Sequence, residues 1–150
     1  MKLFTITALF LMGTVASANC PELSGKFTCP TEEGDLAVEV SQTVDNGVTT
    51  YLIVAGQDHL IFPADNVEQT FEDKSQGIKG KMRVACESNA LKVFQSVAAV
   101  DMSGAELESV DQVDSFTRDA AKALVVSTTG THKADGVETP YNYSMTCAAR

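Results

Sequence analysis

A hairpin pattern between Leu36 and Val54 is the feature of this sequence that most constrains its fold. The stretch LAVEVSQTVDNGVTTYLIV alternates apolar and polar residues as far as Asp45-Asn46-Gly47, and a second apolar stretch follows that turn. A period of two is typical of a half-buried β-strand, and Asn-Gly between two such stretches is a strong hairpin signal. The sequence therefore predicts an antiparallel sheet with one strongly apolar face.

The turn allows two registers for this hairpin. A two-residue Asn-Gly turn pairs Val40 with Ile53, whereas a three-residue turn pairs Val40 with Leu52. We expect the three-residue turn, because it gathers the most apolar residues on one face and a one-residue slip reverses that face. The residues gathered in this way are Leu36, Val38, Val40, Val44, Val48, Leu52 and Val54.

Short alternating stretches between turn signals continue along the chain. They predict an all-β, antiparallel up-and-down meander of eight or nine strands. Within 104–122 the apolar residues also recur at helical spacing, which would give a short helix. The stretch SFTRDAAKALVVS instead has the pattern of two strands around a turn at Asp119, and we favour strands. A meander removes its exposed edges by closing, so we expect a barrel, with a two-sheet sandwich as the alternative.

Residues 1–18 have the pattern of a secretory signal peptide. Lys2 precedes an apolar run that ends in Ala-Ser-Ala, and the run is short for a membrane span. Cleavage after Ala18 leaves 132 residues, 19–150, which we expect to form a single domain. They carry ten basic and 20 acidic residues, a net charge of -10, which argues against nucleic acid or anionic membrane as a partner. No later stretch is long enough to span a membrane, so we expect a periplasmic or secreted protein.

Four cysteines follow the predicted cleavage site. An even number in an exported chain predicts two disulfides, and the sequence leaves three pairings open. We favour Cys20 with Cys29, which closes a small loop around the first turn, and Cys86 with Cys147, which ties the last strand to the middle of the sheet. The chain has no Cys-x-x-Cys, and its two histidines lack ligand-like spacing, so we expect no metal and no cofactor.

No set of residues in the sequence has the pattern of a catalytic site. There is no Gly-x-Ser-x-Gly, and four bonded cysteines leave no thiolate. We therefore expect a non-enzymatic protein, with its oligomeric state left open. One hypothesis is a small apolar ligand held inside the barrel. The residues proposed to line that interior are Val40, Leu52, Phe94, Tyr141, Tyr143 and Met145.

The second hypothesis is an envelope interaction or inhibitor protein that acts through loops or through a basic surface segment. Four of the ten basic residues that follow the signal peptide lie within ten positions. Such a segment suits a partner with acidic groups, and its binding would depend on salt. The four residues are Lys74, Lys79, Lys81 and Arg83.

The first predicted strand resembles the entry of calycin barrels, the lipocalin and avidin superfamily. Gly25-Lys26-Phe27 stands where that superfamily has Gly-x-Trp, and Leu23-Ser24-Gly25-Lys26-Phe27-Thr28 is similar to the avidin opening. The resemblance implies a lipocalin-like closed barrel, and the favoured pairing of Cys86 with Cys147 is similar to the lipocalin bridge from mid-barrel to the C-terminus.

A weaker resemblance is to bacterial inhibitors of c-type lysozyme, which are small exported β-barrels. Phe27-Thr28-Cys29, Leu36-Ala37-Val38 and the stretch from Gly56 to Leu60 look like their first strands. Ser103-Gly104-Ala105 stands in place of their Ser-Gly-x-x-Tyr loop. This resemblance implies a protein partner rather than a reaction.

Overall fold

The computed structural model describes residues 20–150, so the predicted signal peptide lies outside the described residues. The described chain is all-β and antiparallel, with no helix, and consecutive strands are neighbours except β4 and β5, which lie at opposite ends of the strand order. The predicted meander is confirmed, but it has ten strands rather than eight or nine. The strands are β1 (Gly25–Thr31), β2 (Gly34–Asp45), β3 (Val48–Ala55), β4 (Asp58–Pro63), β5 (Glu68–Asp73), β6 (Ile78–Glu87), β7 (Ala90–Val100), β8 (Glu106–Arg118), β9 (Leu124–Ala134) and β10 (Val137–Ala149).

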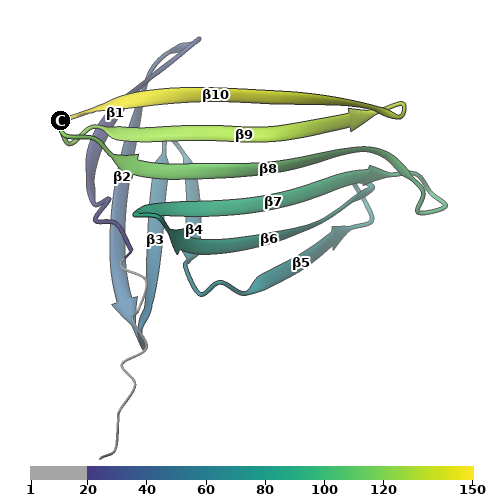
Figure 1. Cartoon of the computed structure of the whole chain (residues 1–150), viewed down its shortest axis with the longest axis horizontal. Helices are drawn as coiled ribbons and strands as arrows, with labels where there is room; N and C mark the ends of the chain where they lie inside the picture. Colours follow the sequence, from purple (N-terminus) through teal and green to yellow (C-terminus); the bar gives the residue numbers. More distant parts are fainter. Residues whose placement is uncertain (1–19) are drawn as a thin grey trace, which may run out of the picture.

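The sheet folds into two layers instead of closing into a barrel. Strands β2 to β4 run across one end of β6 to β10, and the other end of those long strands extends past them (Figure 1). The layers are joined where β1 pairs with β10, through only Phe27 with Ala149 and Thr28 with Ala148. At the far ends of the strand order, β4 and β5 each have one neighbour, so the expected closure is not observed.

The core lies between the two layers. Phe27 and Tyr51 from the first layer and Leu91 and Leu124 from the second are all at most 1% exposed. Burying a large apolar side chain contributes roughly 1.5–3 kcal/mol, so this shared core is the main attraction between the layers. The rest of the core cluster comprises Leu23, Cys29, Val38, Val40, Ile53, Phe62, Val84, Val93 and Cys147.

The register of the β2–β3 hairpin differs from the expected one. Asp45 pairs with Val48 and Val40 pairs with Ile53, so the turn has two residues and the three-residue prediction is wrong. Asn46 and Gly47 both adopt positive φ, 49° and 80°. This is the type I′ geometry, whose twist matches that of the strands, and it outweighs the count of apolar residues on one face.

The disulfides also differ from the favoured pairs. Cys20 bonds Cys86, and Cys29 bonds Cys147, with Cα–Cα distances of 5.1 and 4.1 Å. The cause lies in the topology, because the pairing of β1 with β10 brings Cys29 beside Cys147. The prediction of two disulfides is confirmed, and such bonds are typical of chains that fold in an oxidising compartment.

The stretch that the sequence left between helix and strand forms two strands. β8 ends at Arg118 and β9 begins at Leu124, so the predicted turn at Asp119 is confirmed and no helix forms within 104–122. The Asp119 carboxylate accepts a hydrogen bond from the Ala123 N–H at 2.9 Å. An aspartate that bonds nearby backbone in this way favours a turn over a continuous helix.

Candidate functional site: a groove on the outer face of β6 to β9

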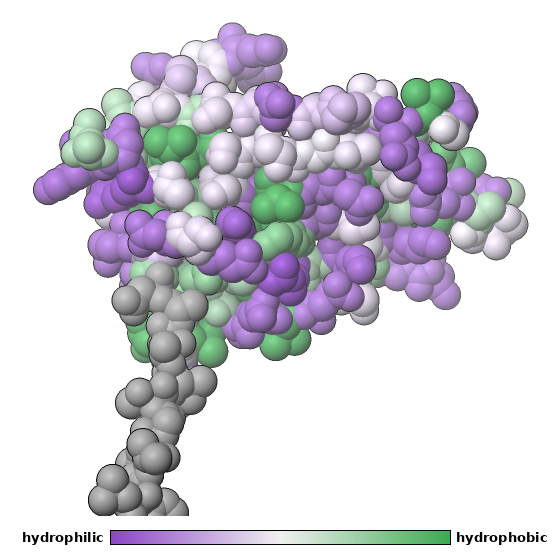
Figure 2. Space-filling model, viewed as in Figure 1, coloured by the Kyte–Doolittle hydropathy of each residue, from purple (hydrophilic) through white to green (hydrophobic). Residues whose placement is uncertain are grey.

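The second layer, β5 to β10, has an inner face toward β1–β4 and an outer face away from them. Side chains alternate between the faces along each strand. On β6, Val84 is buried in the core, so Lys79, Lys81 and Arg83 project from the outer face. The outer face is the one turned toward the viewer in Figure 2, where apolar surface near its centre is surrounded by hydrophilic residues.

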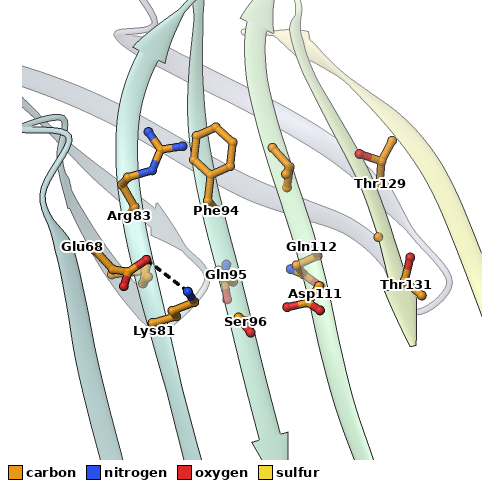
Figure 3. A pocket seen from close by; sticks show the side chains of 13 residues that line it. Glu68, Lys81, Arg83, Phe94, Gln95, Ser96, Asp111, Gln112, Thr129 and Thr131 are labelled. Carbon is orange, nitrogen blue, oxygen red and sulfur yellow. Dashed lines mark ion pairs between the residues drawn. The ribbon is translucent and has the colours of Figure 1, made fainter. Parts of the chain in front are cut away.

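A groove of about 590 Å³ lies on this outer face. The register places Arg83 beside Phe94, Phe94 beside Val113 and Val113 beside Thr129, so four strands contribute one row of side chains. Figure 3 shows this row next to a second, more polar row formed by Lys81, Ser96, Asp111 and Thr131. The complete lining comprises Glu68, Lys81, Met82, Arg83, Phe94, Gln95, Ser96, Asp111, Gln112, Val113, Thr129, Gly130 and Thr131.

Two cations lie on the β6 side of the groove. The Arg83 guanidinium carbon is 3.8 Å from the centroid of the Phe94 ring, and an Arg83 nitrogen lies 3.4 Å from a Glu87 carboxylate oxygen. Lys81 Nζ lies 3.3 Å from Glu68 Oε2, and both side chains are about half exposed. Exposed ion pairs of this kind contribute about 0–1 kcal/mol, so a partner's carboxylate can replace Glu68 at little cost.

The opposite side of the groove offers hydroxyls and one carboxylate. Ser96, Thr129 and Thr131 each supply a group that can both donate and accept a hydrogen bond. Asp111 is exposed and makes no ion pair among the described residues. The groove thus joins two cations, an apolar floor and a row of hydrogen-bonding groups.

A second hollow of about 690 Å³ adjoins the groove toward the β5 edge. It shares Lys81 and Ser96 with the groove and adds Lys79, Thr70 and Glu72. The hollowed surface therefore continues across β5, β6 and β7.

The structure brings most of the predicted basic segment to this surface. Lys79, Lys81 and Arg83 share the outer face of β6 and line the two hollows, whereas Lys74 lies in the turn between β5 and β6. The first three occupy alternate positions in the sequence, which puts them on one face of a strand. Their role as a binding surface stays a prediction.

The six residues proposed to line an interior ligand site are not brought together. Val40 is in the core at 3% exposure, and Leu52 lies on the opposite face of its layer because the hairpin register differs. Phe94 is in the outer groove. Tyr141, Tyr143 and Met145 lie on the inner face of β10, where the side chain of Tyr143 is 57% exposed.

A polar network on the inner face was missed by sequence reasoning. The Asp114 carboxylate accepts hydrogen bonds from Gln95 Nε2 at 3.1 Å, from Gln112 Nε2 at 2.9 Å and from the Thr128 hydroxyl. The Tyr141 hydroxyl donates to Gln112 Oε1 at 2.9 Å, and desolvation, together with the charge of Asp114, raises the pKa of Tyr141. These residues come from four strands, so only their register connects them.

The groove residues Ser96, Asp111, Thr129 and Thr131 were also absent from the predicted sites. Each occupies an ordinary alternating position in its strand, and no local motif marks it. The cross-strand register is the signal that brings them together.

Comparison of the chain with protein-family models, with curated proteins and with solved structures finds no match. Residues 20–150 contain no helix of the length and apolar character needed to cross a membrane. In the same residues, no group of three or more histidine, cysteine, aspartate or glutamate side chains is arranged to hold a metal ion.

Proposed function

We propose that the protein is an exported, non-enzymatic binding protein whose outer groove takes an acidic segment of an envelope protein. The observation that carries this proposal is the grouping of Lys81 and Arg83 with Phe94 in one open groove. Export itself is inferred from the signal-peptide pattern, and the two disulfides fit an oxidising compartment. The resemblances to calycin barrels and to lysozyme inhibitors stay predictions.

The chemistry of the groove suits a carboxylate that neighbours an apolar group. Arg83 stacks on Phe94, so its planar guanidinium is already oriented before a partner arrives. Lys81 supplies a second donor that a partner can take from Glu68. Phe94 and Val113 form the apolar floor on which the neighbouring side chain would pack.

The overall negative charge of the chain affects where an acidic partner can approach. The full sequence has a net charge of -9, so an acidic partner is repelled by most of the molecule. Lys79, Lys81 and Arg83 share one strand face. Glu68, Glu72 and Glu87 neighbour these cations, so the face is close to neutral rather than acidic and the repulsion is locally relieved. An acidic partner therefore meets less repulsion at this face than elsewhere, and added salt weakens its binding to the cations.

The test is capture of the partner from envelope fractions of the source cells by the tagged mature protein. Lys81→Glu and Arg83→Glu are expected to reduce capture at least about tenfold, which corresponds to about 1.4 kcal/mol of binding free energy. Lys26→Glu is the matched control, because Lys26 makes a similar exposed pair with Glu39 at 3.6 Å on the other layer. Equal capture by all three variants would overturn the proposal.

A small molecule with one carboxylate and an apolar body is the second candidate for this groove. Phe94, which the sequence suggested as a ligand residue, lines the groove together with Val113. A volume of about 590 Å³ is within the range of small-molecule sites. Native mass spectrometry of the protein from its own cells distinguishes the two candidates, because a retained small molecule adds a defined mass that Arg83→Glu removes.

A further inference from the structure

We propose that two copies of the chain associate by antiparallel pairing of their β4 strands. β4 is an edge strand with β3 as its only neighbour in the sheet. Among the described residues, the hydrogen bonds of Asp58–Pro63 are confined to the β3 ladder. An edge of this kind exposes a row of backbone donors and acceptors that pair readily with another strand.

The β3–β4 register identifies the backbone groups that remain free. Ala55 pairs with Asp58 across the two-residue turn, so these two exchange hydrogen bonds, as do Ile53 and Leu60 two positions further along. The alternate residues, His59 and Ile61, therefore direct their N–H and C=O groups away from β3. Each copy thus offers two donors and two acceptors at these two residues, and the Pro63 carbonyl, at the next alternate position, adds a third acceptor without a donor.

The side chains of β4 are suited to a copy of themselves. A two-fold axis at Leu60 places Leu60 beside Leu60 of the second copy, and His59 beside Ile61 of that copy. In this register the four free donors meet the His59 and Ile61 carbonyls of the two copies. Leu60 and Ile61 are 46% and 63% exposed, so the contact covers apolar surface. The only carboxylate of the strand, Asp58, then lies beside Phe62 of the second copy rather than beside another acid.

The other edge of the sheet does not favour self-pairing. β5 reads EQTFED, so three of its six residues are acidic. Pairing two copies there would crowd six carboxylates along one ladder, and like charges on neighbouring strands are destabilising. Charged residues are a common protection of edge strands, and in this molecule β5 has that protection while the centre of β4 does not.

The experiment is sedimentation equilibrium of the mature protein from about 10 µM to about 1 mM, which covers affinities typical of small interfaces. We expect a monomer that becomes a dimer as concentration rises. Ile61→Lys is expected to weaken dimerisation at least about tenfold, because it places a charge beside the ladder. Val44→Lys is the matched control, since Val44 is 69% exposed and lies on β2, away from the β4 edge.

A cysteine at the axis tests the register independently of stability. Directly opposite residues at a non-hydrogen-bonded position have Cα atoms about 4.5 Å apart, which a disulfide can span. Leu60→Cys should therefore form a disulfide-linked dimer under mild oxidation, and Val44→Cys should stay monomeric. A wild-type protein that remains monomeric throughout, or equal cross-linking of the two cysteine variants, would overturn the proposal. Neither result bears on the groove, because β4 lies in the other layer.

Discussion

Removal of the Cys29–Cys147 disulfide should destabilise the protein more than most single changes could. The bridge joins β1 to β10, the one place among the described residues where strands of the two layers pair, and there only two residue pairs connect the strands. The two cysteines are 118 residues apart, and in the chain-entropy model a loop of that size contributes about 5 kcal/mol. Domains have a total stability of about 5–15 kcal/mol, so the expected loss is a large fraction of it.

The assay is reversible unfolding of the Cys29→Ala/Cys147→Ala variant in guanidinium, followed by a thermal scan. For a chain of this size, a loss of about 5 kcal/mol lowers the Tm by about 15 °C. The Cys20→Ala/Cys86→Ala variant serves as comparison, since its 66-residue separation gives about 4 kcal/mol in the same model. A loss below about 1 kcal/mol for the first variant would refute the view that this bridge holds the layers together.

Other changes give smaller, defined effects. Tyr51→Phe removes a 2.7 Å hydrogen bond from the buried hydroxyl to the Pro21 carbonyl, and should cost about 1–3 kcal/mol in denaturant unfolding. Burial raises the pKa of Tyr51 to about 12, above its unfolded value of about 10. The free energy of unfolding should therefore fall by up to about 2.7 kcal/mol as the pH rises from about 10 to about 12, because the unfolded state loses the phenol proton first. This fall should be absent in Tyr51→Phe. Asp114→Asn weakens an acceptor of three hydrogen bonds and should lower the free energy of unfolding by about 1–3 kcal/mol, measured by thermal unfolding. Asp111→Asn, on the outer face, is the control, and an equal loss of stability in the two variants would contradict the network. Gly47→Val forces a β-branched residue to a φ of 80° and should cost about 1–2 kcal/mol, with an unchanged Tm as the contrary result.

The strands could be predicted from the sequence because their signals are local. The alternation in β2 and the turn residues at Asn46-Gly47 and Asp119 identify elements without any reference to the rest of the chain. The hairpin register was predicted wrongly because apolar residues on both faces of β3 favour either pairing. There the conformational preference of Asn-Gly, rather than the apolar pattern, decides the register.

The disulfides and the two-layer packing could not be predicted in the same way. The Cys29–Cys147 bond and the two-layer packing depend on β1 pairing with β10, a contact between residues more than 100 positions apart, for which no local pattern exists. The Cys20–Cys86 bond joins residues 66 positions apart, which no local pattern marks either. The groove illustrates the same limit. Lys79, Lys81 and Arg83 share a face by simple alternation, but their position beside Phe94 and Asp111 follows from the register of β6, β7 and β8.

Site-specific cross-linking tests the proposed binding groove most directly. Ser96 lies between Lys81 and Asp111 in the groove, so a photoreactive residue at that position would contact a bound partner. The same residue at Thr43, which is exposed on β2 in the other layer, is the control. Illumination in the source cells should give one adduct from position 96 that Lys81→Glu reduces at least about tenfold, and none from position 43. The same adduct from both positions, or none from position 96, would contradict the assignment of the groove as the binding site.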